Sequence, residues 1–210
     1  GISAIPGVSL PGIFTASDTT HYYAVAITAL IAATGLAMSA CTTTGPNAQA
    51  SAPSARASID SQVDATLSKL YHQVPGSHEL VARAKGVLVF PSVVGGSLIV
   101  GAEHGKGALR VDGATAGYYS LTGASIGLQA GAQSQAVVYV FLTQDALDKF
   151  RASNGWTAGV DANVAVATLG ANGSLDTQTL EKPVISFVLN NVGLAAGASV
   201  QGAKITRTAP

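Results

Sequence analysis

The stretch ALRVDGATAGYYSL, Ala108 to Leu121, gives the clearest indication of the fold of this chain. It contains two runs in which apolar and polar residues alternate, ALRVD (108–112) and GYYSL (117–121), separated only by residues 113–116. A connection this short joins neighbouring antiparallel strands, because a parallel pair needs a crossover of about a dozen residues. The stretch therefore predicts a β-hairpin within an antiparallel sheet.

The same pattern continues on both sides of this hairpin. Short alternating or β-branched runs recur, separated by turn residues such as those at 104–107, 122–123, 134–135, 172–173 and 190–191. The further predicted strands are 86–90, 97–103, 124–133, 136–143, 163–169, 183–189 and 194–207. Glycine recurs inside several of these runs, and interior strand glycines mark bends or close backbone approach. A strongly curved sheet is therefore expected.

Helical spacing of apolar residues appears in three other places. One predicted helix spans 59–72 behind Ser58 as its N-cap, and a short one spans 78–84 after Pro75-Gly76-Ser77. A third spans 144–153, with Thr143 as the N-cap. The predicted fold class is α+β: a large curved antiparallel sheet of meander and hairpins, together with about three helices. The sheet either stays open or closes into a barrel.

Charge and composition divide the chain into two unlike parts. All 11 basic residues lie at Arg56 or beyond, and only 10% of the 210 residues are charged, with a net charge of zero. A nucleic-acid-binding domain normally shows a strongly basic face. The composition is instead that of a small β-rich domain, and nucleic acid is not an expected partner.

Cys41 is the chain's single cysteine, and its position is informative. It directly follows an apolar run at 23–40, and Met38-Ser39-Ala40-Cys41 resembles a bacterial lipobox, although leucine is more usual where Met38 stands. In such signals the cysteine is acylated and becomes the first residue of the mature chain. The charged segment that normally precedes the run is missing, which is explained if roughly the first 20 residues are foreign sequence. The alternative is a single transmembrane anchor, since the run is just long enough to span a bilayer.

These features predict three segments. Residues 1–40 form a signal peptide or N-terminal extension, and 41–57, rich in Ser, Thr, Ala and Pro, form a flexible tether. Residues 58–208 form the folded domain. The expected location is the bacterial cell envelope, as an outer-membrane lipoprotein facing the periplasm or the surface, with palmitate on Cys41.

Two patterns resemble catalytic motifs. Gly123-Ala124-Ser125-Ile126-Gly127 matches G-x-S-x-G, but a nucleophile elbow needs a helix after the serine and a histidine further on. A strand-like run follows Ser125, and the last histidine of the chain is His104. The run around Lys106 lacks the Ser or Thr that a phosphate-binding P-loop places after its lysine. The sequence predicts no enzyme activity, no metal site and no cofactor.

Four basic residues fall close together around the predicted hairpin: Arg83, Lys85, Lys106 and Arg110. If the hairpin returns Arg110 beside the end of the second helix, they form a site for an anionic lipid headgroup, flanked by the apolar run VLVFPSVV. The alternative is ordinary solvated charge.

Long parts of the chain resemble the SYLF (Ysc-type) domain family, and the resemblance covers about 58–207. It rests mainly on AKGVLVFPSVVGGSLIVGAEHGKGALRV, GYYSLTGASIGLQAGAQSQAVVYVF and KPVISFVLNNVGLAAGASVQGAKITR. Eukaryotic members bind phosphoinositides and work at membranes with the actin machinery, and their N-terminal amphipathic helix contributes to membrane binding. The matching segment here, 59–72, contains one basic residue, Lys69, and two acidic residues, Asp60 and Asp64.

The resemblance and the lipobox together imply a lipid-anchored, non-catalytic envelope protein whose domain binds membrane phospholipids or related amphiphiles. One alternative is a structural or protein-interaction module with an envelope protein as its partner. A hydrolase that uses Ser125 is a second alternative.

Overall fold

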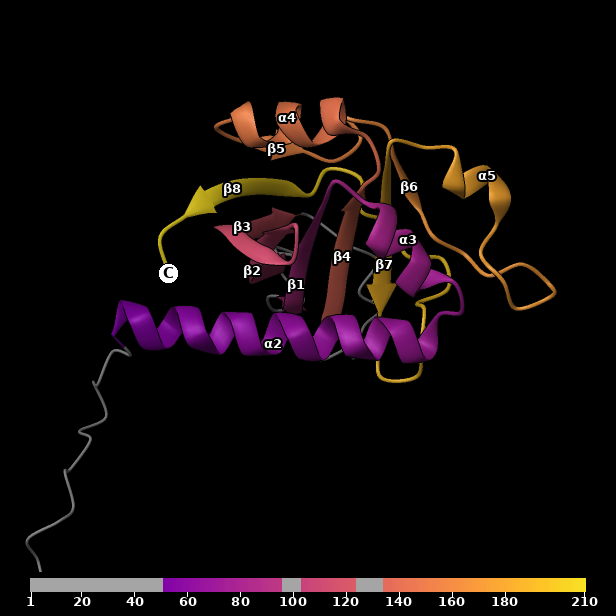
Figure 1. The fold of residues 1–210 in the computed structure, drawn as a ribbon, viewed down its shortest axis with the longest axis horizontal. Coiled ribbons are helices and arrows are strands. Elements are labelled where there is room, and N and C mark those ends of the chain that lie inside the picture. Colours follow the sequence, from indigo (N-terminus) through magenta and orange to yellow (C-terminus); the bar gives the residue numbers. More distant parts are fainter. Residues whose placement is uncertain (1–50, 96–102, 124–133) are drawn as a thin grey trace, which may run out of the picture. The chain divides into compact units, whose positions relative to one another are not determined.

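The computed structural model describes residues 51–95, 103–123 and 134–210 (Figure 1). Within them the chain is α+β, as predicted. The strand predicted at 124–133, most of the one at 97–103, Ser125 and Cys41 lie outside the described residues.

The described strands form one curled sheet in the order β5-β8-β3-β2-β1-β4-β7-β6. Neighbouring strands are antiparallel, as expected, except that β6 runs parallel to β7. The strands are β1 (Gly86–Gly95), β2 (Glu103–Val111), β3 (Ala114–Gly123), β4 (Gln135–Phe141), β5 (Trp156–Thr157), β6 (Val164–Val166), β7 (Val184–Leu189) and β8 (Lys204–Thr208).

All three predicted helices are present: α2 (Ala52–Gln73), α3 (Ser77–Arg83) and α4 (Gln144–Ala152). The Thr143 side chain caps α4 by accepting a hydrogen bond from the amide of Ala146 at 3.2 Å. Helix α2 begins earlier than predicted, so residues 52–57, assigned to the tether, are helical. Pro53 fits the first turn of a helix, where its missing N–H is not needed. The short elements α5 (Thr177–Leu180) and β5 were not predicted.

The hairpin of Ala108 to Leu121 is present, but its turn is shorter than expected. Asp112 and Gly113 both have positive φ, 51° and 79°, as a type I′ turn requires, and β3 already begins at Ala114. The turn predicted at 104–107 was wrong. These residues belong to β2, where Lys106 pairs with Ser92 of β1. Because this glycine-rich run resembles a turn locally, its pairing with β1 was not visible in the sequence.

The two faces of the sheet carry two separate cores. Helices α2 and α3 cover one face and α4 lies across the other (Figure 1). Along β1, Val87 and Val89 belong to the core beneath α2, whereas Leu88 and Phe90 belong to the core beneath α4. This alternation follows from the two-residue period of a strand.

Candidate functional site

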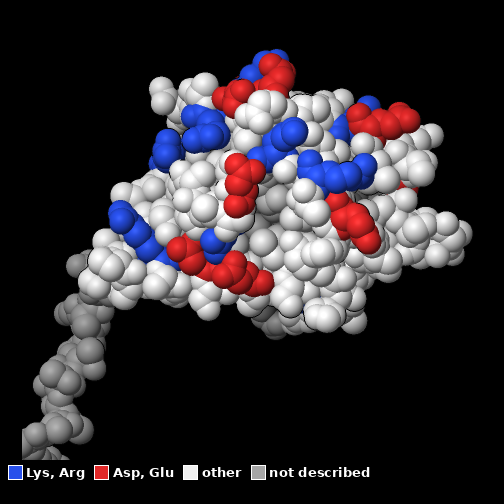
Figure 2. Space-filling view, viewed as in Figure 1, with Lys and Arg blue, Asp and Glu red and all other residues white. Residues whose placement is uncertain are grey.

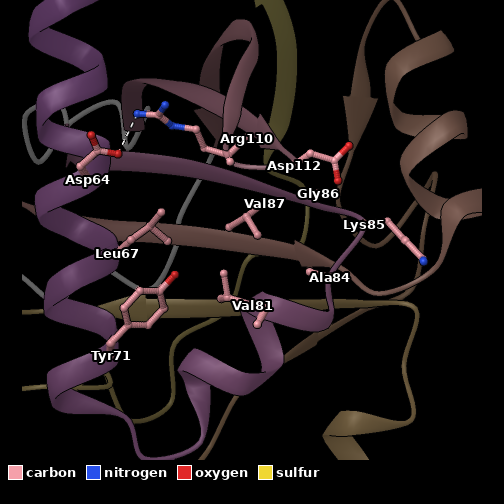
Figure 3. A pocket seen from close by; sticks show the side chains of 12 residues that line it. Asp64, Leu67, Tyr71, Val81, Ala84, Lys85, Gly86, Val87, Arg110 and Asp112 are labelled. Carbon is pink, nitrogen blue, oxygen red and sulfur yellow. Dashed lines mark hydrogen bonds and ion pairs between the residues drawn. The ribbon is translucent and has the colours of Figure 1, made fainter.

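A pocket of about 340 Å³ opens where α2, α3, the start of β1 and the β2–β3 turn meet (Figure 3). Its size is at the lower end of the range for small-molecule sites. Helix α2 provides one wall, and the turn and β1 provide the other. The lining residues are Asp64, Leu67, Tyr71, Val81, Ala82, Ala84, Lys85, Gly86, Val87, Arg110, Asp112 and Gly113.

One part of the pocket is apolar. Leu67 of α2 and Val81 of α3 lie around Val87 of β1, which is 4% exposed. The Tyr71 hydroxyl points toward the interior of the pocket (Figure 3). Burial raises the pKa of Tyr71 above its ordinary value, so the phenol is neutral and able to donate a hydrogen bond near pH 7.

The opposite part is charged and anchored to α2. The Arg110 guanidinium donates to the Asp64 carboxylate at 2.8 Å and to the Asp60 backbone carbonyl at 3.2 Å. The Asp60 carboxylate lies 3.8 Å from the same guanidinium nitrogen. Two carboxylates therefore compensate the charge of Arg110.

Asp60 also connects α2 to the hairpin. Its carboxylate accepts hydrogen bonds from the hydroxyls of Thr115 and Tyr118, each at 2.8 Å. Burial, together with the hydrogen bond to Asp60, raises the pKa of Tyr118. The hairpin and α2 are thus joined by polar contacts beside the pocket, whereas the C-terminal half of α2 packs through Leu70 and other apolar residues.

Two charged residues at the rim have no ion pair within the described ranges: Lys85 and Asp112. Lys85 is exposed, and its backbone amide donates to the Phe141 carbonyl at 2.8 Å, which fixes the backbone at this point. Asp112 is exposed at the type I′ turn. Both lie on the side of the pocket away from α2 (Figure 3).

The structure brings two of the four predicted basic residues, Lys85 and Arg110, into one pocket. Arg83 is exposed in the last turn of α3, and Lys106 is exposed on β2, and neither lines the pocket.

Three polar lining residues were not predicted as site residues from the sequence: Asp64, Tyr71 and Asp112. Two signals were present. Residues 64, 67 and 71 share one face of a helix, and Asp112-Gly113 is a type I′ turn signal. Neither signal showed which segment lies opposite.

Other kinds of site find little support in the described part of the chain. There, no three His, Cys, Asp or Glu side chains gather as metal ligands would. His72, His78 and His104 are all exposed, and His78 packs edge-on against Tyr71 with ring centroids 4.8 Å apart. None of the described helices combines the length and the apolar character needed to cross a bilayer.

Comparison with known proteins identifies the C-terminal part of the chain. Residues 122–209 match the model of the Ysc84 family, described as "Las17-binding protein actin regulator". No curated protein matches the chain. The match confirms the resemblance to SYLF domains over residues 122–209.

Proposed function

We propose that this domain is a non-catalytic binding module that takes up a phospholipid or a related amphiphile in the pocket between α2, α3 and the β2–β3 turn. The observation that carries the proposal is the division of this pocket into an apolar part and a charged rim. An amphiphile has the same two parts. All the residues that line the pocket precede residues 122–209 in the sequence, so the proposal is supported by the geometry of the pocket itself. The family match to 122–209 is consistent with it.

The pocket offers a place for each part of such a ligand. Acyl methylenes pack against Leu67, Val81 and Val87, where each buried methylene contributes about 0.8 kcal/mol. The Tyr71 hydroxyl donates to an ester or phosphate oxygen, and the headgroup lies at the rim beside Lys85. With about 340 Å³, the pocket holds a headgroup and a short stretch of chain while the rest of the lipid stays in the membrane.

Blocking the pocket should abolish lipid binding. Ala82 lines it and is exposed on α3, so Ala82→Trp fills the opening without disturbing either core. In calorimetric titration of the full chain with a soluble dihexanoyl phospholipid, which offers no bilayer to the apolar run at 23–40, we expect this variant to lose most of the binding of the wild type.

The matched control is Ala152→Trp, which adds the same side chain at an exposed position of α4, on the other face of the sheet. It should bind like the wild type. Both variants keep the apolar run at 23–40 unchanged, so a difference between them reports on the pocket. Equal binding by the two variants would exclude the pocket as the lipid site.

We further propose that the chain is held in the bacterial envelope, as an outer-membrane lipoprotein, through acylation of Cys41. The lipobox-like sequence at 38–41 supports this proposal. Radioactive palmitate should label the wild-type chain in cells, and Cys41→Ser should remove the label. Persistent labelling of the variant would contradict acylation at this cysteine.

Protein binding is a second candidate function, favoured by one edge of the sheet. β5 pairs with β8 only through Trp156 with Ile205 and Thr157 with Lys204. Among the described strands, no other pairs with the outer edge of β8, which leaves residues 206–208 free for strand addition by a partner. Crosslinking in intact cells tests this candidate, since one dominant partner crosslinked through β8 is expected if it is right.

A further inference from the structure

The charges around the pocket are balanced, not uniformly basic. Two cations, Lys85 and Arg110, line it together with two anions, Asp64 and Asp112. Figure 2 shows the same mixture on a larger scale, with acidic and basic side chains interleaved over the face that it presents. The pocket therefore offers no strong positive field that would select a purely anionic ligand.

The two rim charges on the side away from α2 are the ones available to a ligand. Arg110 is already compensated by Asp64 at 2.8 Å and by Asp60 at 3.8 Å. Lys85 and Asp112 have no such partner among the described residues, and both are exposed. A ligand that satisfies both must carry a negative and a positive group.

The backbone at both residues is fixed, so both side chains extend from defined points of the rim. Asp112 occupies the first central position of the type I′ turn, with φ of 51°, a conformation that Asp and Asn tolerate better than most residues. The backbone of Lys85 is held because its amide donates a hydrogen bond to the carbonyl of Phe141 in β4, the strand that pairs with β1.

We propose that the pocket selects a zwitterionic headgroup, one that carries a phosphate and a primary ammonium, as in phosphoethanolamine. This proposal rests on the proposed function, since it names the lipid class for the same pocket. The phosphate lies beside Lys85, and the ammonium donates to the Asp112 carboxylate. A phosphoglycerol headgroup brings the same negative charge without the ammonium. It therefore places a second anion near the Asp112 carboxylate and offers that carboxylate no positive partner.

Calorimetric titration of the full chain with soluble dihexanoyl phospholipids tests the headgroup. We expect dihexanoyl phosphatidylethanolamine to bind about fivefold more tightly than dihexanoyl phosphatidylglycerol, the scale set by exposed ion pairs. Asp112→Asn removes one charge and retains a turn-compatible side chain. It should weaken phosphatidylethanolamine binding and remove the preference. Lys85→Gln should weaken binding of both lipids, whereas Lys106→Gln, outside the pocket, should change neither.

Tighter binding of phosphatidylglycerol, or an Asp112→Asn variant with an unchanged preference, would overturn the proposal. These outcomes differ from failure of the proposed function. If both lipids bind equally and Ala82→Trp abolishes the binding, the pocket is still a lipid site and only the headgroup assignment is wrong. If neither lipid binds a chain shown to be folded, the lipid site itself is wrong, and this inference falls with it.

Discussion

Replacing Gly107 by alanine is expected to destabilise the domain by at least about 3 kcal/mol, the upper end of the range for overpacking. Gly107 lies in β2 beneath the bulge of β1, where Phe90 and Pro91 together oppose this one residue. A Cβ atom there would overlap the Val89 carbonyl oxygen and would lie 2.7 Å from the Phe90 ring. Because the obstruction includes backbone, the sheet itself must shift.

Urea unfolding of the full chain measures the effect. The matched control is Gly155→Ala, whose Cβ would lie 3.4 Å from the flexible end of the Lys204 side chain, an ordinary contact. We expect the control to stay within about 1 kcal/mol of the wild type. A Gly107→Ala variant as stable as the Gly155→Ala variant would show that β1 and β2 are not packed as described.

Replacing Phe150 by alanine should cost about 3–5 kcal/mol, the usual range for losing a buried phenyl ring. Phe150 is 1% exposed and is the side chain through which α4 meets the aromatic cluster on the sheet. The centroid of its ring lies 4.9 Å from the ring centroid of Phe141, 5.0 Å from that of Tyr119 and 5.5 Å from that of Trp156. The truncation leaves a cavity among rigid aromatic neighbours that cannot collapse to fill it.

Trp156 provides the readout, since it is 2% exposed and is the chain's only tryptophan. Its fluorescence should report unfolding of the variant at a lower urea concentration. The control is Lys149→Ala on the exposed side of α4, which removes only a surface ion pair to Asp145 and should change stability by about 0.5 kcal/mol or less. Equal unfolding midpoints for the two variants would contradict the packing of α4 against the sheet.

The predictions that succeeded rested on local patterns. The alternation in Ala108 to Leu121 predicted the hairpin, and Thr143 predicted the start of α4. The failures involved glycine and proline. The run at 104–107 was assigned to a turn because its glycines resemble one, whereas Gly107 is needed for close approach to β1. Pro53 was assigned to a tether, although it fits the first turn of α2.

The pocket was predictable only in part, because its walls are distant in sequence. Arg110 and Lys85 were grouped by their closeness along the chain, which is how the sequence found them. Asp64 reaches Arg110 only because α2 crosses the hairpin, a packing arrangement that no local pattern specifies. The same crossing neutralises Arg110 and changes the expected ligand from an anion to a zwitterion.

Photo-crosslinking can show directly whether a lipid occupies the pocket between α2 and α3, with the full chain bound to vesicles that contain a phospholipid with a diazirine in its acyl chain. We expect adducts on Leu67, Tyr71 and Val81, detected by mass spectrometry of the digested chain, and their loss in Ala82→Trp. Adducts that never include α2 or α3, or that persist unchanged in Ala82→Trp, would show that the lipid does not bind in this pocket.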